Sequence, residues 1–315
     1  MNIYEIVTTR ILNQLAARQI PWRKTWKTGL PKSLNSGHEY RGVNLLVLGS
    51  NEYTSRYWLT FRQAERLGGY VRKGEHATPV VYWKWRTPEE LAKRAGETGK
   101  DNLAPCVPFV SAVFNLDQVE GVARPDDDLP QRPEDRLQVA DQMLDVMPDK
   151  PEIVHTVTAQ PSYSPRLDRI TLPHLSQFES ADEYFSTLFH ELTHSTGAPR
   201  RLNRFAEAEG DRVEKYSFEE LVAEFGAAFL CGFVGIQNPD TDALQASYIE
   251  GWARVFQQDS RILVRAASAA QRAADYIRGK IPAEEPAVGT GMTPEPRSAS
   301  ESGQPVAAVL ESCHE

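Results

Sequence analysis

The stretch His190-Glu191-Leu192-Thr193-His194 decides how this chain is interpreted, because it has the His-Glu-x-x-His spacing of a zinc-binding helix. Residues four apart lie one above the other on the same face of a helix. Both imidazoles can therefore reach one metal ion, while Glu191 points alongside them. The stretch makes the chain a candidate metallopeptidase, and the alternative is a chance match in an unrelated helix.

The residues on either side of the motif predict the helix that this chemistry needs. Ser180 fits an N-cap and Glu183 lies three residues later, as in a capping box. Gly197 and Pro199 follow the motif and predict the end of the helix. Between them, apolar residues recur at helical spacing at Phe185, Leu188, Phe189 and Leu192.

A catalytic zinc ion needs a third protein ligand, and a second apolar helix at 218–230 carries acids that could supply it. Glu220 and Glu224 share a face of that helix with two alanines, and such small side chains allow close packing against the motif helix. Glu219 is expected to point elsewhere, into solvent. The third ligand is therefore sought in Glu220 or Glu224.

These two helices resemble the zincin-like metallopeptidases of the gluzincin type: HELTHSTG at 190–197 is followed about one helix later by EELVAEFGAAFL at 219–230. The resemblance implies Glu220 as the third metal ligand and Glu224 as the acid that orients a histidine ligand, and the reverse order stays open. It implies one catalytic Zn²⁺ ion, with Mn²⁺ or another divalent ion as the alternative.

Two residues are assigned to catalysis itself. Glu191 is expected to act as the general base for amide hydrolysis, and Tyr216 is a candidate donor to the oxyanion.

A purely structural zinc site is the alternative, but such sites favour closed sets of cysteines. Cys106, Cys231 and Cys313 are scattered and form no Cys-x-x-Cys pair.

The first 125 residues differ from the rest in charge and in aromatic content. They hold 18 Lys and Arg against 11 Asp and Glu, a net charge of +7, whereas the remainder has a net charge of −15. Five of the six tryptophans lie before residue 90. Interleaved rings and cations suit single-stranded nucleic acid, because bases stack on rings while Lys and Arg follow the phosphates. The alternative is that about half of these rings belong to a core.

Five motifs of this region occur in the order of a known domain: IPWRKTW at 20–26, HEYRGVN at 38–44, WLTFRQA at 58–64, LGGYVRKGE at 67–75 and VVYW at 80–83. They resemble the amino-terminal single-stranded-DNA-binding domain of ArdC-type antirestriction proteins, which also begins the TraC-type plasmid primases. With the zincin-like part, the resemblance reaches about residue 280. The residues that combine a ring, a cation or a polar group with this pattern are expected to bind DNA: Trp22, Lys24, Trp26, Tyr40, Arg41, Asn44, Tyr57, Trp58, Arg72, Lys73 and Trp83.

The expected fold class is α+β, with two domains. An α+β single-stranded-DNA-binding domain is expected at 1–125, followed by an acidic, proline-broken linker at 126–133. A mostly helical zincin-like (gluzincin) metallopeptidase domain with a small sheet is expected at 134–281. Residues 282–315 are rich in Pro, Gly, Ser and Glu and are expected to be a disordered tail. The segment 169–173 is expected to be an edge strand beside the motif helix, either a shelf for extended substrate or an ordinary edge strand.

Several classes of protein are excluded by the sequence. No signal-peptide pattern and no run of 18 apolar residues occurs, so no membrane partner is expected. Three cysteines without a pairing pattern favour a reducing compartment, and a cytoplasmic location is expected. No P-loop or dinucleotide pattern is present, so no nucleotide cofactor is expected.

The family resemblance implies an antirestriction protein that binds single-stranded DNA without sequence preference and protects incoming plasmid DNA during conjugation. Its expected partners are single-stranded DNA and a protein or peptide substrate of unknown identity. Protection by coating the strand and protection by proteolysis of a DNA-bound host protein both stay open. Two further alternatives use the same parts: a metalloprotease that repairs DNA-protein crosslinks, and a DNA-binding protein with a catalytically silent zincin-like domain.

Overall fold

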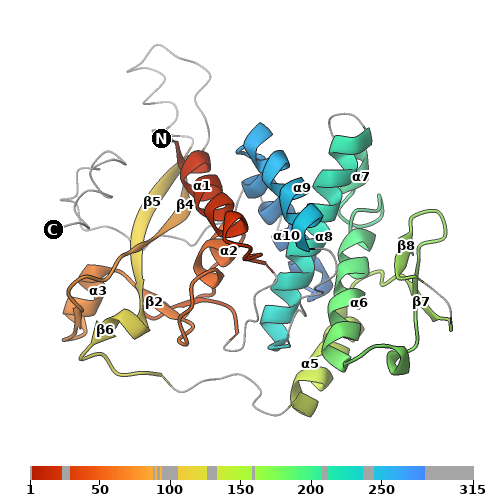
Figure 1. Cartoon of the computed structure of the whole chain (residues 1–315), viewed down its shortest axis with the longest axis horizontal. Coiled ribbons are helices and arrows are strands. Elements are labelled where there is room, and N and C mark those ends of the chain that lie inside the picture. Colours follow the sequence, from red (N-terminus) through yellow and green to blue (C-terminus); the bar gives the residue numbers. More distant parts are fainter. Residues whose placement is uncertain are drawn as a thin grey trace.

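Helices and small sheets combine in a two-domain α+β fold, as the sequence predicts (Figure 1). The computed structural model describes residues 2–22, 29–87, 89–90, 93, 106–125, 133–157, 160–207, 212–236 and 245–280. Almost all of the predicted linker and the whole predicted tail lie outside these residues, as do Lys24 and Trp26.

The N-terminal domain combines helices with a four-stranded sheet and a two-stranded pair formed by β3 (Tyr70–Val71) and β6 (Val119–Glu120). Its described helices are α1 (Ile3–Ala16), α2 (Val43–Gly49) and α3 (Phe61–Arg66), and its strands are β1 (Lys32–Ser33), β2 (Tyr57–Leu59), β3 (Tyr70–Val71), β4 (Thr78–Trp85), β5 (Cys106–Asn115) and β6 (Val119–Glu120), with the 3-10 turn η1 (Leu116–Gln118). The larger sheet has the order β1-β2-β5-β4, in which β4 and β5 form a long antiparallel pair. β4 is therefore an edge strand of this sheet.

The C-terminal domain is mostly helical, and its helix α8 (Arg212–Val234) packs against both α6 (Ala181–Ser195) and α10 (Ile262–Ile277). Its described elements are the helices α5 (Pro133–Val146), α6 (Ala181–Ser195), α7 (Arg204–Glu207), α8 (Arg212–Val234), α9 (Gln245–Gln258) and α10 (Ile262–Ile277), the strands β7 (Glu152–His155), β8 (Ser162–Ser164) and β9 (Arg169–Leu172), and the 3-10 turn η2 (Leu175–Gln177). The small sheet lies beside α6 at the outer side of the domain (Figure 1). Within the described residues, no helix is both long enough and apolar enough to cross a membrane.

The small sheet corrects one expectation. β9, predicted as the edge strand, is the central strand of the order β7-β9-β8 and pairs with both neighbours. Among the described strands, the edge strand beside α6 is β8, which contacts that helix. Its sequence Ser162-Tyr163-Ser164 is too short and too polar to show the alternation that marks a strand.

The motif helix α6 begins where its cap predicts. Ser180 Oγ accepts a hydrogen bond from the Glu183 main-chain N–H at 3.1 Å. The helix ends at Ser195, and the nearby Gly197 has a packing role. A Cβ atom at Gly197 would lie 2.4 Å from the ring of Phe205, which follows the first residue of α7. The missing side chain thus lets α7 fold back onto the end of α6.

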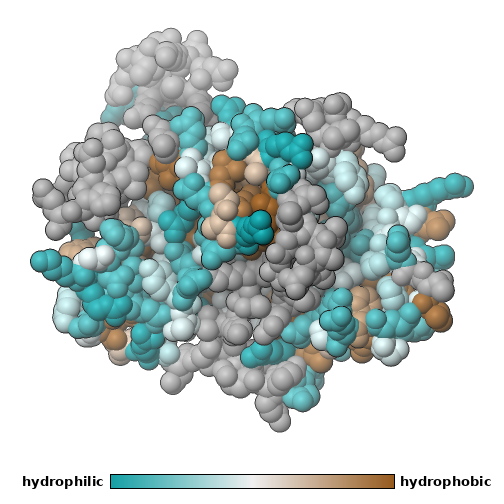
Figure 2. All heavy atoms as spheres, in the orientation of Figure 1, coloured by the Kyte–Doolittle hydropathy of each residue, from teal (hydrophilic) through white to brown (hydrophobic). Residues whose placement is uncertain are grey.

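One hydrophobic core crosses the boundary between the two domains. Trp22 is fully buried, and its ring packs edge-on against Phe225 of α8 and Phe256 of α9. Its indole N–H donates to the hydroxyl of Tyr248 at 3.3 Å. α1 also packs against α9, and α2 against α10. Figure 2 shows apolar atoms gathered between the positions of α1 and α9, framed by hydrophilic residues.

Polar contacts join the domains as well. Arg41, just before α2, forms an ion pair with Asp275 of α10. The main-chain N–H of Gly42 donates to Gln271 Oε1 at 3.0 Å, and Gly42 has a φ of 56°, a conformation that favours glycine. The start of α2 is therefore fixed against the C-terminal domain.

Candidate metal centre

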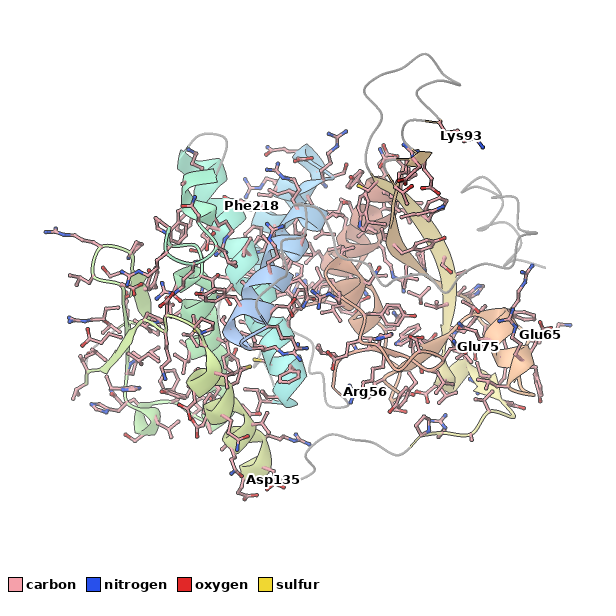
Figure 3. All side chains as sticks on the ribbon, turned by 180° about the vertical axis from the view of Figure 1, so that it is seen from behind. Arg56, Glu65, Glu75, Lys93, Asp135 and Phe218 are labelled. Carbon is pink, nitrogen blue, oxygen red and sulfur yellow. The ribbon has the colours of Figure 1, made fainter. Side chains whose placement is uncertain are left out.

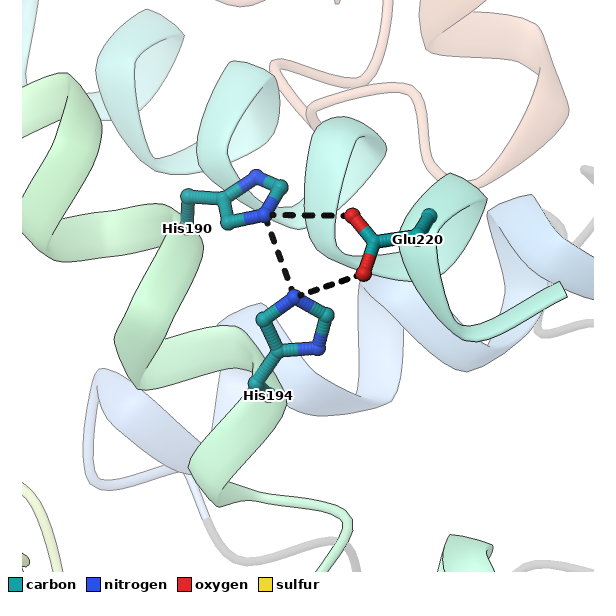
Figure 4. A group of neighbouring side chains, drawn as sticks. All are labelled: His190, His194 and Glu220. Carbon is teal, nitrogen blue, oxygen red and sulfur yellow. Dashed lines mark hydrogen bonds and ion pairs between the residues drawn. The ribbon is translucent and has the colours of Figure 1, made fainter. Parts of the chain in front are cut away.

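His190 and His194 lie one turn apart on α6, and both rings point toward Glu220 of α8 (Figure 4). Their Nε2 atoms are 3.1 Å apart. One oxygen of Glu220 lies 3.6 Å from His190 Nε2, and the other lies 3.6 Å from His194 Nε2. Across the described residues, this is the group whose ligand atoms lie close enough to hold a metal ion, all within 4.8 Å of one another.

The spacing of the two Nε2 atoms and the Glu220 oxygens suits a divalent ion. Bonds of about 2.0–2.1 Å at tetrahedral angles place two ligand atoms roughly 3.3 Å apart. The Nε2–Nε2 distance of 3.1 Å and the distance of 3.6 Å from each Nε2 to its nearer Glu220 oxygen bracket that value. Two imidazole nitrogens and a carboxylate oxygen are also a ligand set that zinc accepts.

Glu191 lies on the same helix between the two histidines and is only 7% exposed. Burial raises the pKa of its carboxyl above the ordinary value, although the charges of His190 and His194 oppose the change. The main-chain N–H of Tyr163 on β8 also donates to this carboxyl. A carboxyl whose pKa moves toward neutrality is suited to accept and return a proton.

Tyr216, in the first turns of α8, is 66% exposed and lies next to the same group. Its hydroxyl donates to the Glu220 carboxylate, whose charge raises the pKa of Tyr216. The residue is therefore on the solvent side of the candidate metal site. Its role as donor to an oxyanion stays a prediction.

Glu219 corrects the expectation that it points into solvent. Its Oε1 lies 3.1 Å from His194 Nδ1, and Arg204 of α7 binds both of its oxygens at 2.7 Å. Burial disfavours the ionised form of Glu219, but Arg204 and His194 outweigh it and lower the pKa of this carboxyl. Sequence reasoning missed Arg204, because only the fold of α7 brings it to α8.

Glu224 lies one turn after Glu220, and its charge acts on His190. Burial of His190 disfavours its protonated form, but Glu220, Glu224 and Glu191 together raise the pKa of this imidazole. Glu220, and not Glu224, belongs to the group of three ligand atoms. The orienting role of Glu224 stays a prediction. The carboxylate that contacts the imidazole of His194 belongs to Glu219.

Helices α6 and α8 approach each other closely at Gly226. A Cβ atom there would lie 2.5 Å from both Cγ2 and Oγ1 of Thr193. Thr193 is fully buried, and its hydroxyl donates to the Phe189 carbonyl at 2.7 Å. Thr193 lies next to His194, so the contact brings the histidine helix within reach of Glu220.

Comparisons with known proteins agree with this architecture. Residues 1–114 match the model of the N-terminal domain of anti-restriction factor ArdC, and residues 141–269 match the model of a zincin-like metallopeptidase. The metal-free crystal structure of the antirestriction ArdC protein from the R388 plasmid aligns at 34% identity with a TM-score of 0.69, over 89% of this chain and 98% of that chain. The chain belongs to the ArdC family of antirestriction proteins. The Mn(II)-bound structure of the same ArdC protein aligns at 33% identity with a TM-score of 0.69.

Curated relatives share the ArdC-like region. Two proteins named DNA primase TraC from Escherichia coli are 33% and 31% identical over 87% of this chain. The match covers only 27% and 20% of those primases, so this chain spans about a quarter of their length or less. The protein y4eC of Sinorhizobium fredii is 30% identical over 89% of this chain and 92% of its own length.

Most of the rings that the sequence suggested as DNA contacts of this ArdC-family chain are buried. The exposed fractions are at most 8% for Trp22, Tyr40, Asn44, Trp58 and Trp83. No base can stack on these rings without opening the core, which corrects the expectation. Cations flank the rings along the sequence, but the rings themselves pack inward.

Asn44 has a structural role instead. Its side-chain amide donates to the Val81 carbonyl at 2.6 Å, and its Oδ1 accepts from the Val81 N–H at 2.7 Å. Val81 belongs to the edge strand β4. These two bonds attach α2 to β4 and satisfy buried main-chain groups.

The remaining suggested residues have more access to solvent. Arg72 and Lys73 are exposed, while Arg41 and Tyr57 are partly buried. Arg72 pairs with Glu75 at 2.7 Å. Lys24 and Trp26 lie outside the described residues.

Proposed function

We propose that this chain binds single-stranded DNA through its N-terminal domain, hydrolyses peptide bonds at a divalent metal ion in its C-terminal domain, and protects incoming plasmid DNA during conjugation. The convergence of His190, His194 and Glu220 on one point supports the peptidase most strongly. The zincin-like match and the Mn(II)-bound relative both support a divalent ion. Zn²⁺ is the proposed ion, and Mn²⁺ is the alternative.

The residues around this point can share the steps of amide hydrolysis. A divalent ion held there supplies Lewis acidity and makes water easier to deprotonate. Glu191 accepts the proton of the attacking water and returns it to the leaving amine. Tyr216 donates to the oxyanion. An extended peptide is proposed to lie along the edge strand β8 beside α6, where the Tyr163 N–H donates to Glu191.

The proposed DNA-binding surface is formed by α3 and β3, which pack against each other. Phe61 and Tyr70 are 49% and 56% exposed there, and Lys73 is exposed nearby. Exposed rings offer faces to bases, and the lysine offers a contact to phosphate. Figure 3 shows Glu65 of α3 at the outer end of the N-terminal domain, opposite the half that contains Phe218 of α8. DNA on this surface leaves the metal centre open.

The double substitution Phe61→Ala and Tyr70→Ala is expected to weaken binding of an oligo(dT) strand tenfold or more. Stacking of one base on one ring contributes about 1–3 kcal/mol. Fluorescence anisotropy of a labelled strand measures the change. Leu67→Ala is the matched control, because Leu67 is 48% exposed on the same surface and has no ring. If the double variant and the control bind with equal affinity, the DNA-binding surface lies elsewhere.

The proposed function is tested by loading the chain with Zn²⁺ or Mn²⁺ and incubating it with casein, with and without single-stranded DNA. Cleavage that a chelator abolishes supports the peptidase. Cleavage confined to a DNA-protein crosslink and stimulated by single-stranded DNA would favour crosslink repair. DNA binding without cleavage at any metal loading would favour a silent zincin-like domain.

A further inference from the structure

The contacts behind His194 extend the site beyond the three proposed ligands, and their interpretation rests on the proposed metal centre. We propose that Glu219 and Arg204 are a positioning pair, which holds His194 in the tautomer and ring orientation that metal binding requires. Neither side chain belongs to the group of three ligand atoms. Their proposed effect on the ion passes through the imidazole of His194.

The orientation of the His194 ring follows from the side chains that its two ring nitrogens contact. Nδ1 faces Glu219 Oε1 at 3.1 Å, whereas Nε2 faces His190 and Glu220. Arg204 donates to both oxygens of the Glu219 carboxylate, and a carboxylate held in this way accepts a hydrogen bond, so Nδ1 is the nitrogen that donates to it. Nε2 then keeps its lone pair on the side where the proposed ligand atoms converge.

Arg204 fixes the carboxylate in turn. It is only 7% exposed, and its Nε and Nη2 donate to the two oxygens of Glu219 at 2.7 Å each. This two-point contact prevents the carboxylate from rotating away from His194. Arg204 also donates to the Thr196 hydroxyl at 3.1 Å and to the Thr193 carbonyl at 3.0 Å. The pair is therefore anchored to the helix end that carries His194.

A purely structural ion pair would predict a different outcome from a positioning pair. Replacing both members of a buried pair with apolar residues of similar size is often neutral for stability, because no charge is left unpaired. A structural pair replaced in this way would leave metal affinity unchanged. A positioning pair would leave the fold intact and lose metal affinity.

The neighbouring pair of Arg201 and Asp168 supplies a matched control. The Arg201 side chain is fully buried, and it binds both oxygens of Asp168 at 2.8 and 2.9 Å. Arg201 also donates to the carbonyl of Ser195, the residue after His194, at 3.0 Å. It thus touches the same end of α6 through the main chain and not through the imidazole.

The experiment compares Mn²⁺ affinity by isothermal titration calorimetry for the parent chain, Glu219→Leu with Arg204→Met, and Arg201→Met with Asp168→Asn. The first double variant is expected to bind Mn²⁺ about 10- to 100-fold more weakly, the usual effect of losing a partner behind a metal-ligating histidine. The control is expected to stay within about twofold of the parent, since its partners miss the imidazole. The Co²⁺ absorption spectrum should change in the first double variant only.

Glu219→Gln provides an isosteric second variant, in case the double variant does not fold. Its NH2 group cannot accept the Arg204 Nε–H that now meets Glu219 Oε2, and the negative charge beside His194 is lost, so weaker Mn²⁺ binding is expected again. Parental affinity in a folded Glu219→Leu/Arg204→Met or Glu219→Gln chain overturns the positioning pair, as does an equal loss in the control. Failure of the parent chain itself to bind Mn²⁺ and Zn²⁺ would instead overturn the proposed function.

Discussion

Glu191→Gln is expected to reduce casein hydrolysis by about 10²- to 10⁴-fold or more while the chain still binds one divalent ion. The amide cannot accept the proton of the attacking water, but Glu191 is not in the group of ligand atoms, which comprises His190, His194 and Glu220. His194→Ala should lose the ion together with activity. Elemental analysis of the purified variants, run beside the hydrolysis assay, separates the two effects.

Glu250→Gln is the control for this experiment, because Glu250 is exposed on α9. Loss of the ion in Glu191→Gln equal to that in His194→Ala would contradict the separation of base from ligands. The same Glu191→Gln variant distinguishes the two routes of antirestriction. Protection that persists in a conjugation assay indicates coating of the strand, whereas loss of protection indicates proteolysis.

Gly226→Ala is expected to lower the free energy of unfolding by about 3 kcal/mol, at the upper end of the usual cost of overpacking. The added Cβ would lie 2.5 Å from two side-chain atoms of Thr193 and 3.0 Å from its Cβ, which is fixed to the main chain. Relief of this clash requires α6 and α8 to separate. Because α6 carries both histidines and α8 carries Glu220, metal affinity should fall as well.

Urea unfolding and Mn²⁺ titration measure the two effects of Gly226→Ala. Gly251→Ala is the matched control, since Gly251 lies inside α9 and a Cβ there meets nothing within 4 Å. In that control alanine should raise the free energy of unfolding by about 0.5–1 kcal/mol through its helix propensity. Parental stability and parental metal affinity in Gly226→Ala would show that the helices do not depend on this contact.

The candidate metal centre could be predicted from the sequence because its two histidines have a characteristic spacing within one helix. The histidine pair needs only one helix, and that helix is signalled by its own cap and apolar repeat. The prediction of Glu220 required a second helix. It was possible because the separation between the histidine motif and this glutamate along the chain resembles a family pattern. The structure brings His190, His194 and Glu220 together, and their role as metal ligands stays a prediction.

The rest depended on contacts between distant segments. Glu219 contacts His194 of α6 and Arg204 of α7, and no spacing within one helix reveals either contact. Trp22, Trp58 and Trp83 are buried because of the face that each strand or loop turns toward its neighbours, which the sequence pattern does not reveal. Trp22 shows this most clearly, since its partners Phe225 and Phe256 lie more than two hundred residues away.

The central claim is that His190, His194 and Glu220 hold one divalent ion, and Mn²⁺ titration of Glu220→Gln against Glu224→Gln tests it most directly. Both variants replace a carboxylate with an isosteric amide on α8, one turn apart. The parent and Glu224→Gln are expected to bind one ion per chain, and Glu220→Gln is expected to bind it far more weakly because an anionic ligand is lost. Parental affinity in Glu220→Gln, or loss of the ion in Glu224→Gln alone, would contradict the claim.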